Sequence, residues 1–494
     1  MTTAQIPTKA VPTPAPAPTA ARPASARRAM TTRRRLVILG GVGVVLVVIT
    51  LLQALNAYNV SNQLFRNLID INSTTVDASE NALQDIAQVS QAAADYAVLS
   101  SDTPLYEQSQ NNIFRAFSSF RDEMFTLRNN IQDAEERTAF TTADTFAYSS
   151  FWRHVSDLVS QRSNDAVAQQ QYLDADNHVR LWINPALQRL ENLNFQQMVA
   201  AGNEAGANII GQVILLAIPG IVLAILLTYL SFMLRQKVHR YLTPGIDGAV
   251  VLSWLILLLM LINLLSAPNQ LSTMIQDSYR SVSGSSRVLV DANLANRAES
   301  SELLDSGRAD AWNTLFDEEA QLIELRMCGL PNCTQKSFVS SGSADQPTDS
   351  VVNAANNITP DNSAKIEGIV PLIANVTFSG ETTALEQARI AFQQFLTVNT
   401  NLRGLIQSNK MDDAIKLNTT IDGATGAAQT SQDAFNDFVT AINKVRDINH
   451  AVFNQVGQSA SQTLQTNRII FGLVGYILIG VLLVLGVNHR YREL

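Results

Sequence analysis

The sequence predicts an all-α membrane protein with four transmembrane helices and two extracytoplasmic up-and-down helical bundles. Three observations carry this prediction. Only 16% of the 494 residues are charged, whereas an ordinary soluble protein has about 25%. Four stretches lack charged residues and are apolar over about the length that a membrane-spanning helix needs. The two long segments between them have the composition of helices rather than of alternating strands.

The four predicted spans are residues 36–52, 209–234, 248–266 and 469–487. None of them contains Asp, Glu, Lys, Arg or His. The first span follows Arg33, Arg34 and Arg35, and a basic run of this kind also precedes the apolar part of a signal peptide. The residues after the span, Gln53 to Ala57, offer no A-x-A cleavage site. We therefore interpret this span as an uncleaved signal anchor.

The distribution of Lys and Arg predicts the orientation, because the cytoplasmic flanks of spans are enriched in these residues. Residues 1–35 contain seven basic and no acidic residues, the loop 235–247 contains three basic and one acidic residue, and the tail 488–494 contains two basic and one acidic residue. We place all three in the cytoplasm of a bacterial cell. The segments 53–208 and 267–468 then lie outside the plasma membrane.

The net charge of −8 combines two opposite surfaces. The inner segments hold 12 basic and 2 acidic residues, a net charge of +10, whereas the outer segments hold 23 basic and 41 acidic residues, a net charge of −18. The acidic character argues against nucleic acid as a partner, since phosphates require a basic face. The basic inner part suits anionic lipids of the bilayer or an acidic partner, and the orientation effect explains it equally well.

The composition of residues 1–35 predicts a disordered cytoplasmic tail. Proline is frequent among Ala and Thr in this segment, and apolar residues are too few to offset the entropy of ordering the chain. A docking or phosphorylation role and an inert tail are both open.

The first outer segment, residues 53–208, predicts a four-helix bundle. We expect a first helix from about residue 53 to 101 that continues the span, two middle helices, and a last helix that enters the second span. Capping residues and proline predict helix starts at Asp102-Thr103-Pro104 and at Asn184-Pro185. An apolar seam at spacings of three and four is formed by Phe117, Phe120, Met124, Leu127 and Ile131.

The second outer segment, residues 267–468, repeats this plan. Helical stretches are expected over about 267–327 and 382–468, with a break at Ser408-Asn409. A shift of 275 residues aligns seven identical residues of two seam regions, whereas a shift of 236 aligns different segments. The sequence therefore predicts a duplicated span-bundle-span plan without fixing the residue alignment. The second seam comprises Phe392, Phe395, Leu402 and Ile406, and Asn399 interrupts it.

The two cysteines of the chain, Cys328 and Cys333, lie in the second outer segment, before a stretch rich in Ser, Thr, Asn and Gly. An oxidising environment outside the cell lets such a pair form a disulfide. Two thiols are too few for a metal site, and the C-x4-C spacing lacks the context of a thioredoxin-like motif. We predict a structural disulfide that closes a small loop inserted in the second bundle.

Catalytic, cofactor-binding and metal-binding motifs are not found. The five His residues lie far apart, and no Walker-type, GxSxG or paired-His pattern occurs, so an enzyme is not expected. The candidate ligand-binding residues are Arg128 and Arg403, each of which follows a seam Leu and lies at the edge of a bundle core. Such an Arg suits an anionic ligand. A solvated flank or a salt bridge within the bundle is the alternative.

Two resemblances concern the architecture. The stretch Asp412-Asp-Ala-Ile-Lys-Leu417, after a helix break and before a helix that continues into the last span, resembles the sensor modules of bacterial chemoreceptors. No HAMP, methyl-accepting, kinase or cyclase domain follows a span, in contrast to those receptors. The whole plan, with an Arg-rich start, two outer helical segments, the inner loop Arg235–Asp247 and a short tail, resembles the GlnX family of actinobacterial membrane proteins.

The GlnX resemblance implies a relay in which an extracytoplasmic amino-acid-binding protein is sensed outside and a soluble Ser/Thr kinase is informed inside. We therefore expect a non-enzymatic signalling adaptor whose outer bundles bind a protein or a small ligand. A structural or assembly protein of the cell envelope is the alternative. A small-molecule receptor acting alone is disfavoured by the missing output domain, and a homo-oligomer stays open.

Overall fold

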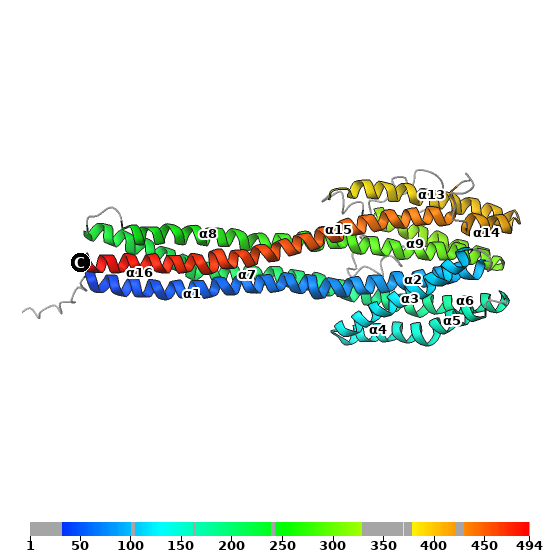
Figure 1. Cartoon of the computed structure of the whole chain (residues 1–494), viewed down its shortest axis with the longest axis horizontal. Coiled ribbons are helices and arrows are strands. Elements are labelled where there is room, and N and C mark those ends of the chain that lie inside the picture. The colour runs from blue at the N-terminus through cyan, green and yellow to red at the C-terminus, as the bar shows by residue number, and fades with distance from the viewer. Residues whose placement is uncertain are drawn as a thin grey trace, which may run out of the picture.

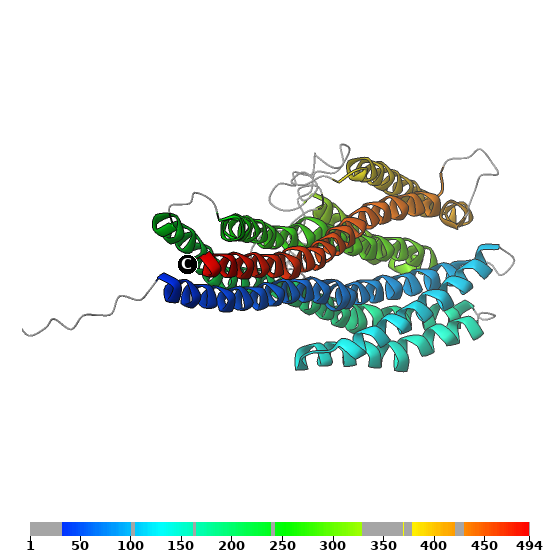
Figure 2. The same ribbon diagram turned by 60° about the vertical axis from the view of Figure 1, so that its left-hand side comes forward.

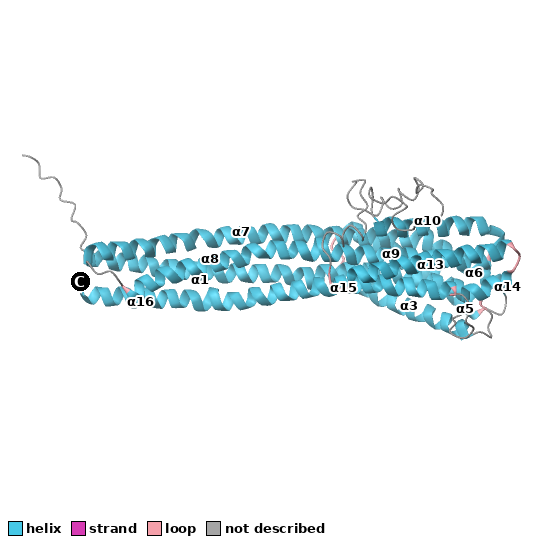
Figure 3. Ribbon diagram, turned by 90° about the horizontal axis from the view of Figure 1, so that it is seen from above, coloured by secondary structure: helices cyan, strands magenta, loops and turns pink. Residues whose placement is uncertain are grey.

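The computed structural model describes residues 32–99, 104–161, 165–238, 243–328, 369, 378–419 and 429–493. All regular secondary structure in these ranges is helical (Figure 3). The molecule is elongated, and both ends of the described chain lie at the same end of it (Figure 1).

Four helices run through most of the length of the molecule, and each continues through a π-helical segment (η) without a loop (Figure 1). The first comprises α1 (Thr32–Asn67), η1 (Leu68–Ser73) and α2 (Thr74–Val98). The second comprises α6 (Asp165–His178), η3 (Val179–Ile183) and α7 (Asn184–Val238). The third comprises α8 (Pro244–Ser272), η4 (Thr273–Tyr279) and α9 (Arg280–Leu304). The fourth comprises α15 (Ser431–Asn467), η6 (Arg468–Gly475) and α16 (Tyr476–Glu493).

The shorter helices of the described ranges lie at the far end, which we call the head (Figure 1). Asp133 starts one of them through a capping box, because its carboxylate accepts hydrogen bonds from the backbone N–H groups of Glu135 and Glu136. These helices are α3 (Pro104–Asn130), α4 (Ala134–Phe146) continued by η2 (Ala147–Phe151) and α5 (Trp152–Ser160), the short 3-10 helix η5 (Ser306–Arg308), α10 (Ala309–Cys328), α13 (Glu381–Gln407) and α14 (Met411–Thr419).

Within the described ranges, four helices are long and apolar enough to cross a membrane, and they contain the four predicted spans. α7 packs against α1 and α8, and α16 packs against the same two helices. Outward-facing apolar side chains such as Val45, Ile218, Leu258 and Val484 are 50–60% exposed, as expected of groups that face lipid. Gly245 and Gly486 bring α8 and α16 together, since a Cβ on Gly245 would lie 2.9 Å from the Gly486 Cα.

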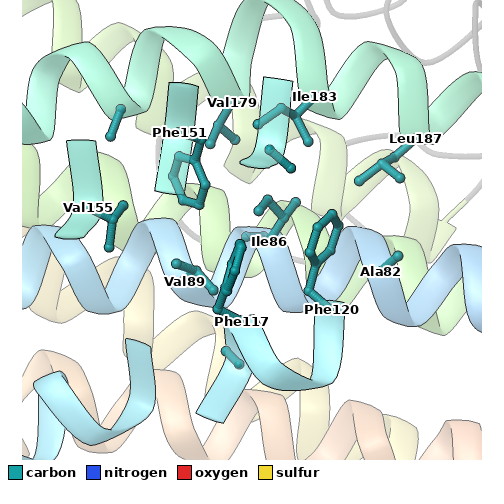
Figure 4. Packing of buried hydrophobic residues seen from close by; sticks show 14 of the residues in the cluster. Ala82, Ile86, Val89, Phe117, Phe120, Phe151, Val155, Val179, Ile183 and Leu187 are labelled. Carbon is teal, nitrogen blue, oxygen red and sulfur yellow. The ribbon is translucent and has the colours of Figure 1, made fainter. Parts of the chain in front are cut away.

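The first half of the head, here the first module, contains α2, α3, the α4–η2–α5 helix and α6 with the start of α7. α3 runs back along α2, and the Asn81 amide donates to Glu123 Oε1 at 3.2 Å. Figure 4 shows how Ile86, Phe120, Phe151 and Val179 fill its core. The predicted seam is confirmed over its helical part, because Phe117, Phe120, Met124 and Leu127 are all buried.

The second half of the head, the second module, contains α9, α10, α13, α14 and the first part of α15. α9 packs against α10 and α15, and α13 packs against α15. Phe392, Phe395 and Leu402 of the predicted seam are fully buried. Asn399, which interrupts the seam, is buried as well and donates to Glu299 Oε2 at 2.7 Å. A polar residue in this seam is therefore paired rather than exposed.

The two modules form one head. α2 of the first module lies along α9 of the second, and Val290 and Leu294 of α9 belong to the hydrophobic core of the first module. Figure 2 shows α3 to α6, in cyan and teal, on one side of the long helices, and α13 and α14, in olive and brown, on the other. The prediction of two bundles did not include this shared core.

Several predicted boundaries change. The predicted tail 1–35 lies outside the described residues except for 32–35, which begin α1. The helix start predicted at Asn184-Pro185 is wrong, because the chain is helical from Asp165 onward and the wider turns of η3 precede the proline. The stretch 267–327 is interrupted at Asp305, and 382–468 is interrupted at the predicted break, where Asn409 adopts a φ of 57°.

Candidate functional site

Helix α9 occupies the middle of the head and is unusually polar for its position. Nearly all of its residues are buried, including many Ser, Asn, Arg, Asp and Glu side chains. A helix that is buried on every side is ordinarily apolar, and buried polar groups require hydrogen-bond partners. The partners of these side chains therefore define how α9 is held.

Most of these partners belong to the first module. Arg287 Nη2 lies 2.7 Å from Glu191 Oε1 of α7, and Arg297 Nη1 lies 2.9 Å from Asp176 Oδ1 of α6. The Ser300 hydroxyl donates to Asp95 Oδ1 of α2 at 2.6 Å. Three helices of the first module are thus joined to α9 by charged or polar contacts.

Buried carboxylates gather around the same helix. Burial raises the pKa of Glu80 to about 8, and the neighbouring Glu191 and Asp77 add to the rise. Burial also raises the pKa of Glu319 to about 8, with Asp291 contributing, and that of Glu299 to about 7. Clusters of ionisable groups with shifted pKa values occur at functional sites and in structural ion-pair networks alike.

A cavity of about 390 Å³ opens beside this network, between α2, α3 and α15. One wall is a stripe of α2 from Asp85 to Asp95, followed by Leu99 just after the helix, and α3 contributes an antiparallel stripe from Leu105 to Ser119. Gln432 to Val439 of α15 form the third wall, and Asn293 of α9 is the contribution of the central helix. Both modules therefore line the cavity, whose volume is in the range of small-ligand sites.

Two carboxylates of α2 line the cavity. Burial raises the pKa of Asp85 to about 7, against a lowering effect of Ser119. Burial raises the pKa of Asp95 to about 6, against lowering hydrogen bonds from Ser300 and Gln91. Arg115, the basic residue of the described lining, is exposed on α3.

The predicted candidates lie apart from this cavity. Arg128 is exposed at the end of α3. Burial raises the pKa of Asp144, and the nearby Arg128 opposes this rise. Arg403 binds Asp317, with Nη2 at 2.9 Å from Oδ1, and its guanidinium lies 5.0 Å from the centre of the Phe316 ring. For Arg403 the salt-bridge alternative therefore holds. The structure does not bring the two arginines together.

The predicted disulfide falls outside the described part of the chain. Cys333 is not described, and for Cys328 the structure gives only its place as the last residue of α10. Within the described ranges, no group of three or more His, Cys, Asp and Glu side chains is placed to hold a metal ion.

The sequence contains a signal for the polar centre that is distinct from the apolar seams. Residues 280–304 combine small residues with isolated Arg, Asp and Glu and have no continuous apolar stripe. In a segment that is helical and lies between two apolar seams, this pattern is typical of a helix packed on all sides through close contacts. The cavity carboxylates Asp85 and Asp95 gave no distinct signal, because single acidic residues on a helix are usually solvated.

Comparison with known protein families, with curated proteins and with solved structures gives no match to this chain. The geometry of the head and its connection to the apolar helices therefore carry the functional argument.

Proposed function

We propose that this protein is a multi-pass signalling adaptor of the bacterial plasma membrane. In this proposal the head lies outside the cell and binds a small ligand or a solute-binding protein. The four long helices transmit the resulting change, and the cytoplasmic surface presents it to a partner such as a Ser/Thr kinase. The architectural resemblance to the GlnX family suggests these partner classes.

The observation that carries the proposal is the continuity of the helices. The apolar stretches lie within unbroken helical runs from Arg33 to Val98, Ala166 to Gln236, Pro244 to Leu304 and Ser431 to Arg492. A helix is stiff along its axis, so a shift of 1–2 Å at one end reaches the other when the helix is uninterrupted. A protein that only anchored the head would not need four such connections.

Three π-helical segments lie on the path between the head and the apolar stretches. η1 and η4 lie on the head side of the first and third apolar stretches, and η6 overlaps the head-side end of the fourth. π-Helical turns are rare and occur frequently at functional sites. Their position supports a piston or rotation rather than a rigid tether.

The charge distribution supports the proposed orientation. Arg33, Arg34 and Arg35 begin α1, and Arg490 and Arg492 end α16, so both basic clusters lie at the end of the molecule away from the head. Cytoplasmic flanks are enriched in Lys and Arg. The acidic head would then face the outside of the cell.

A structural role in envelope assembly is the second candidate. It is favoured by the ion pairs Arg287–Glu191 and Arg297–Asp176, the second of them fully buried, which join the two modules to one another. A rigid head suits a tether that does not switch.

Cross-linking followed by pull-down from membranes distinguishes the two candidates. A membrane-impermeant reagent should capture a solute-binding protein on the head, and a permeant reagent should also capture a kinase or another signalling protein inside. A variant without residues 1–30 is the control, because it removes part of the basic inner surface and should reduce only the inner capture. Recovery of envelope-assembly proteins alone would refute the relay.

A further inference from the structure

The cavity between α2, α3 and α15 has a charge pattern that points to a class of ligand. We propose that it binds a small linear organic cation with an amino group toward each end, of the polyamine type. The proposal rests on the shape of the cavity, the spacing of Asp85 and Asp95, and the polar groups between them.

The two carboxylates lie far apart along one helix. Asp85 and Asp95 are both part of the α2 stripe that lines the cavity, and ten residues of helix separate them by about 15 Å. The α2 wall continues to Leu99, so the cavity runs about 20 Å along the helix axis. A single metal ion cannot bridge two groups at this distance, whereas an extended chain with two ammonium groups can.

Among the described residues, neither carboxylate forms an ion pair with a basic side chain. Asp95 accepts hydrogen bonds from Ser300 and Gln91, at 2.6 and 3.1 Å, and both donors are neutral. Asp85 Oδ2 is enclosed and has no hydrogen-bond partner among the described residues. Burial without a counter-charge raises the pKa of both carboxyl groups, and an ammonium ion placed beside each would relieve that penalty.

The remaining lining suits the body of such a ligand. Asn293 is 2% exposed and uses its amide nitrogen on the Leu289 carbonyl at 2.6 Å. Its side-chain oxygen receives no hydrogen bond from the described residues and is available in the cavity to a secondary amine. Ala92 and Phe435 supply apolar surface for methylene groups.

An anionic ligand fits less well. Arg115 is the basic residue among the described lining, and it is exposed. An anion held there would gain one charge contact in solvent and would face two carboxylates along the rest of the cavity. Charge complementarity therefore favours a dication over an acidic amino acid.

A ligand bound in this cavity would link the two modules. Asp85 and Asp95 belong to α2, which continues through η1 into α1, and the wall formed by Phe435 belongs to α15, which continues through η6 into α16. This consequence rests on the proposed relay, but binding itself does not and can be measured on the purified chain.

The test is isothermal titration of the full chain in nanodiscs with spermidine, putrescine and L-glutamate as probes. Spermidine should bind more tightly than the shorter putrescine, and glutamate should not bind. Asp85→Asn and Asp95→Asn should each weaken spermidine binding at least about tenfold. The matched control is Asp122→Asn on α3, whose side chain is 75% exposed outside the cavity and which should leave spermidine binding unchanged.

Both Asn variants remove a buried charge, so they should keep or raise the Tm of the empty protein, and a thermal scan verifies that they are folded. Absence of spermidine binding at millimolar concentration, equal binding by all three variants, or tighter binding of glutamate would overturn the proposal. Each of these results would leave the relay standing, because titration measures occupancy. Spermidine binding without any change in cytoplasmic capture would support the site and count against the relay.

Discussion

Replacement of Arg297 by Met should lower the free energy of unfolding of the head by about 3 kcal/mol. Arg297 and Asp176 are 1% and 2% exposed, with Nη1 and Oδ1 2.9 Å apart, so the substitution leaves a buried carboxylate without its partner. Breaking such a pair costs about 3–5 kcal/mol. The lower value applies because neither atom makes an aligned hydrogen bond within the described chain, and because Arg180 remains 3.7 Å from Asp176.

The assay is thermal unfolding of the purified protein in nanodiscs at one fixed scan rate, because a large membrane protein unfolds irreversibly. At about 2 °C per kcal/mol for a large domain, Arg297→Met should lower the Tm by about 6 °C. Arg308→Met is the matched control, since the Arg308 side chain of the Arg308–Asp305 pair is 57% exposed and surface pairs contribute little.

The double variant Arg297→Met/Asp176→Leu should regain most of the loss, because an apolar pair in place of a buried ion pair is often neutral. An unchanged Tm in the single variant, or a double variant as unstable as the single one, would refute the reasoning.

Three further predictions concern other parts of the molecule. Because the folded-state pKa of Glu80 is raised to about 8, its contribution to stability is complete below about pH 4 and is lost as the pH rises through 8. Glu80→Gln should therefore flatten the fall in Tm between about pH 5 and 8, and an unchanged slope would contradict the assignment. Phe120→Ala in the core shown in Figure 4 should cost about 3–5 kcal/mol, whereas Phe125→Ala, at a residue 67% exposed, should stay within about 0.5 kcal/mol; equal Tm shifts would count against this core. Gly486→Ala should separate α8 from α16 and lower the Tm, since its Cβ would lie 2.8 Å from the backbone nitrogen of Ile246, whereas Gly41→Ala meets nothing within 4 Å and should be neutral; the order of the two Tm values decides this prediction.

The sequence was sufficient for the features that depend on apolar periodicity. The four spans are visible as uncharged apolar runs, and the seams at Phe117 to Leu127 and Phe392 to Leu402 are buried as their spacing indicates. Periodicity reports which face of a helix is buried, and these helices each have one clear face.

The joint between the modules was not predictable in the same way. α9 is buried on all sides by Ser, Ala, Asn and paired charges, and its sequence has no apolar face that would indicate a partner. The helix continues without a loop past Pro185, although a proline ordinarily marks the start of a helix. The wider turns of η3 directly precede this proline, and the sequence gives no sign of them. The cavity requires the register of α2 against α3 and α15, which depends on contacts between distant segments rather than on local pattern.

The relay is tested most directly by the distance between the inner ends of α1 and α16. Spin labels on Val37→Cys and Leu485→Cys, at side chains 49% and 59% exposed, with Cys328 and Cys333 replaced by Ser, report this distance in nanodiscs. When the head is occupied by spermidine or by a captured outer protein, the relay requires a shift of about 1–2 Å in this distance. An unchanged distance distribution, with occupancy verified by titration, would contradict it.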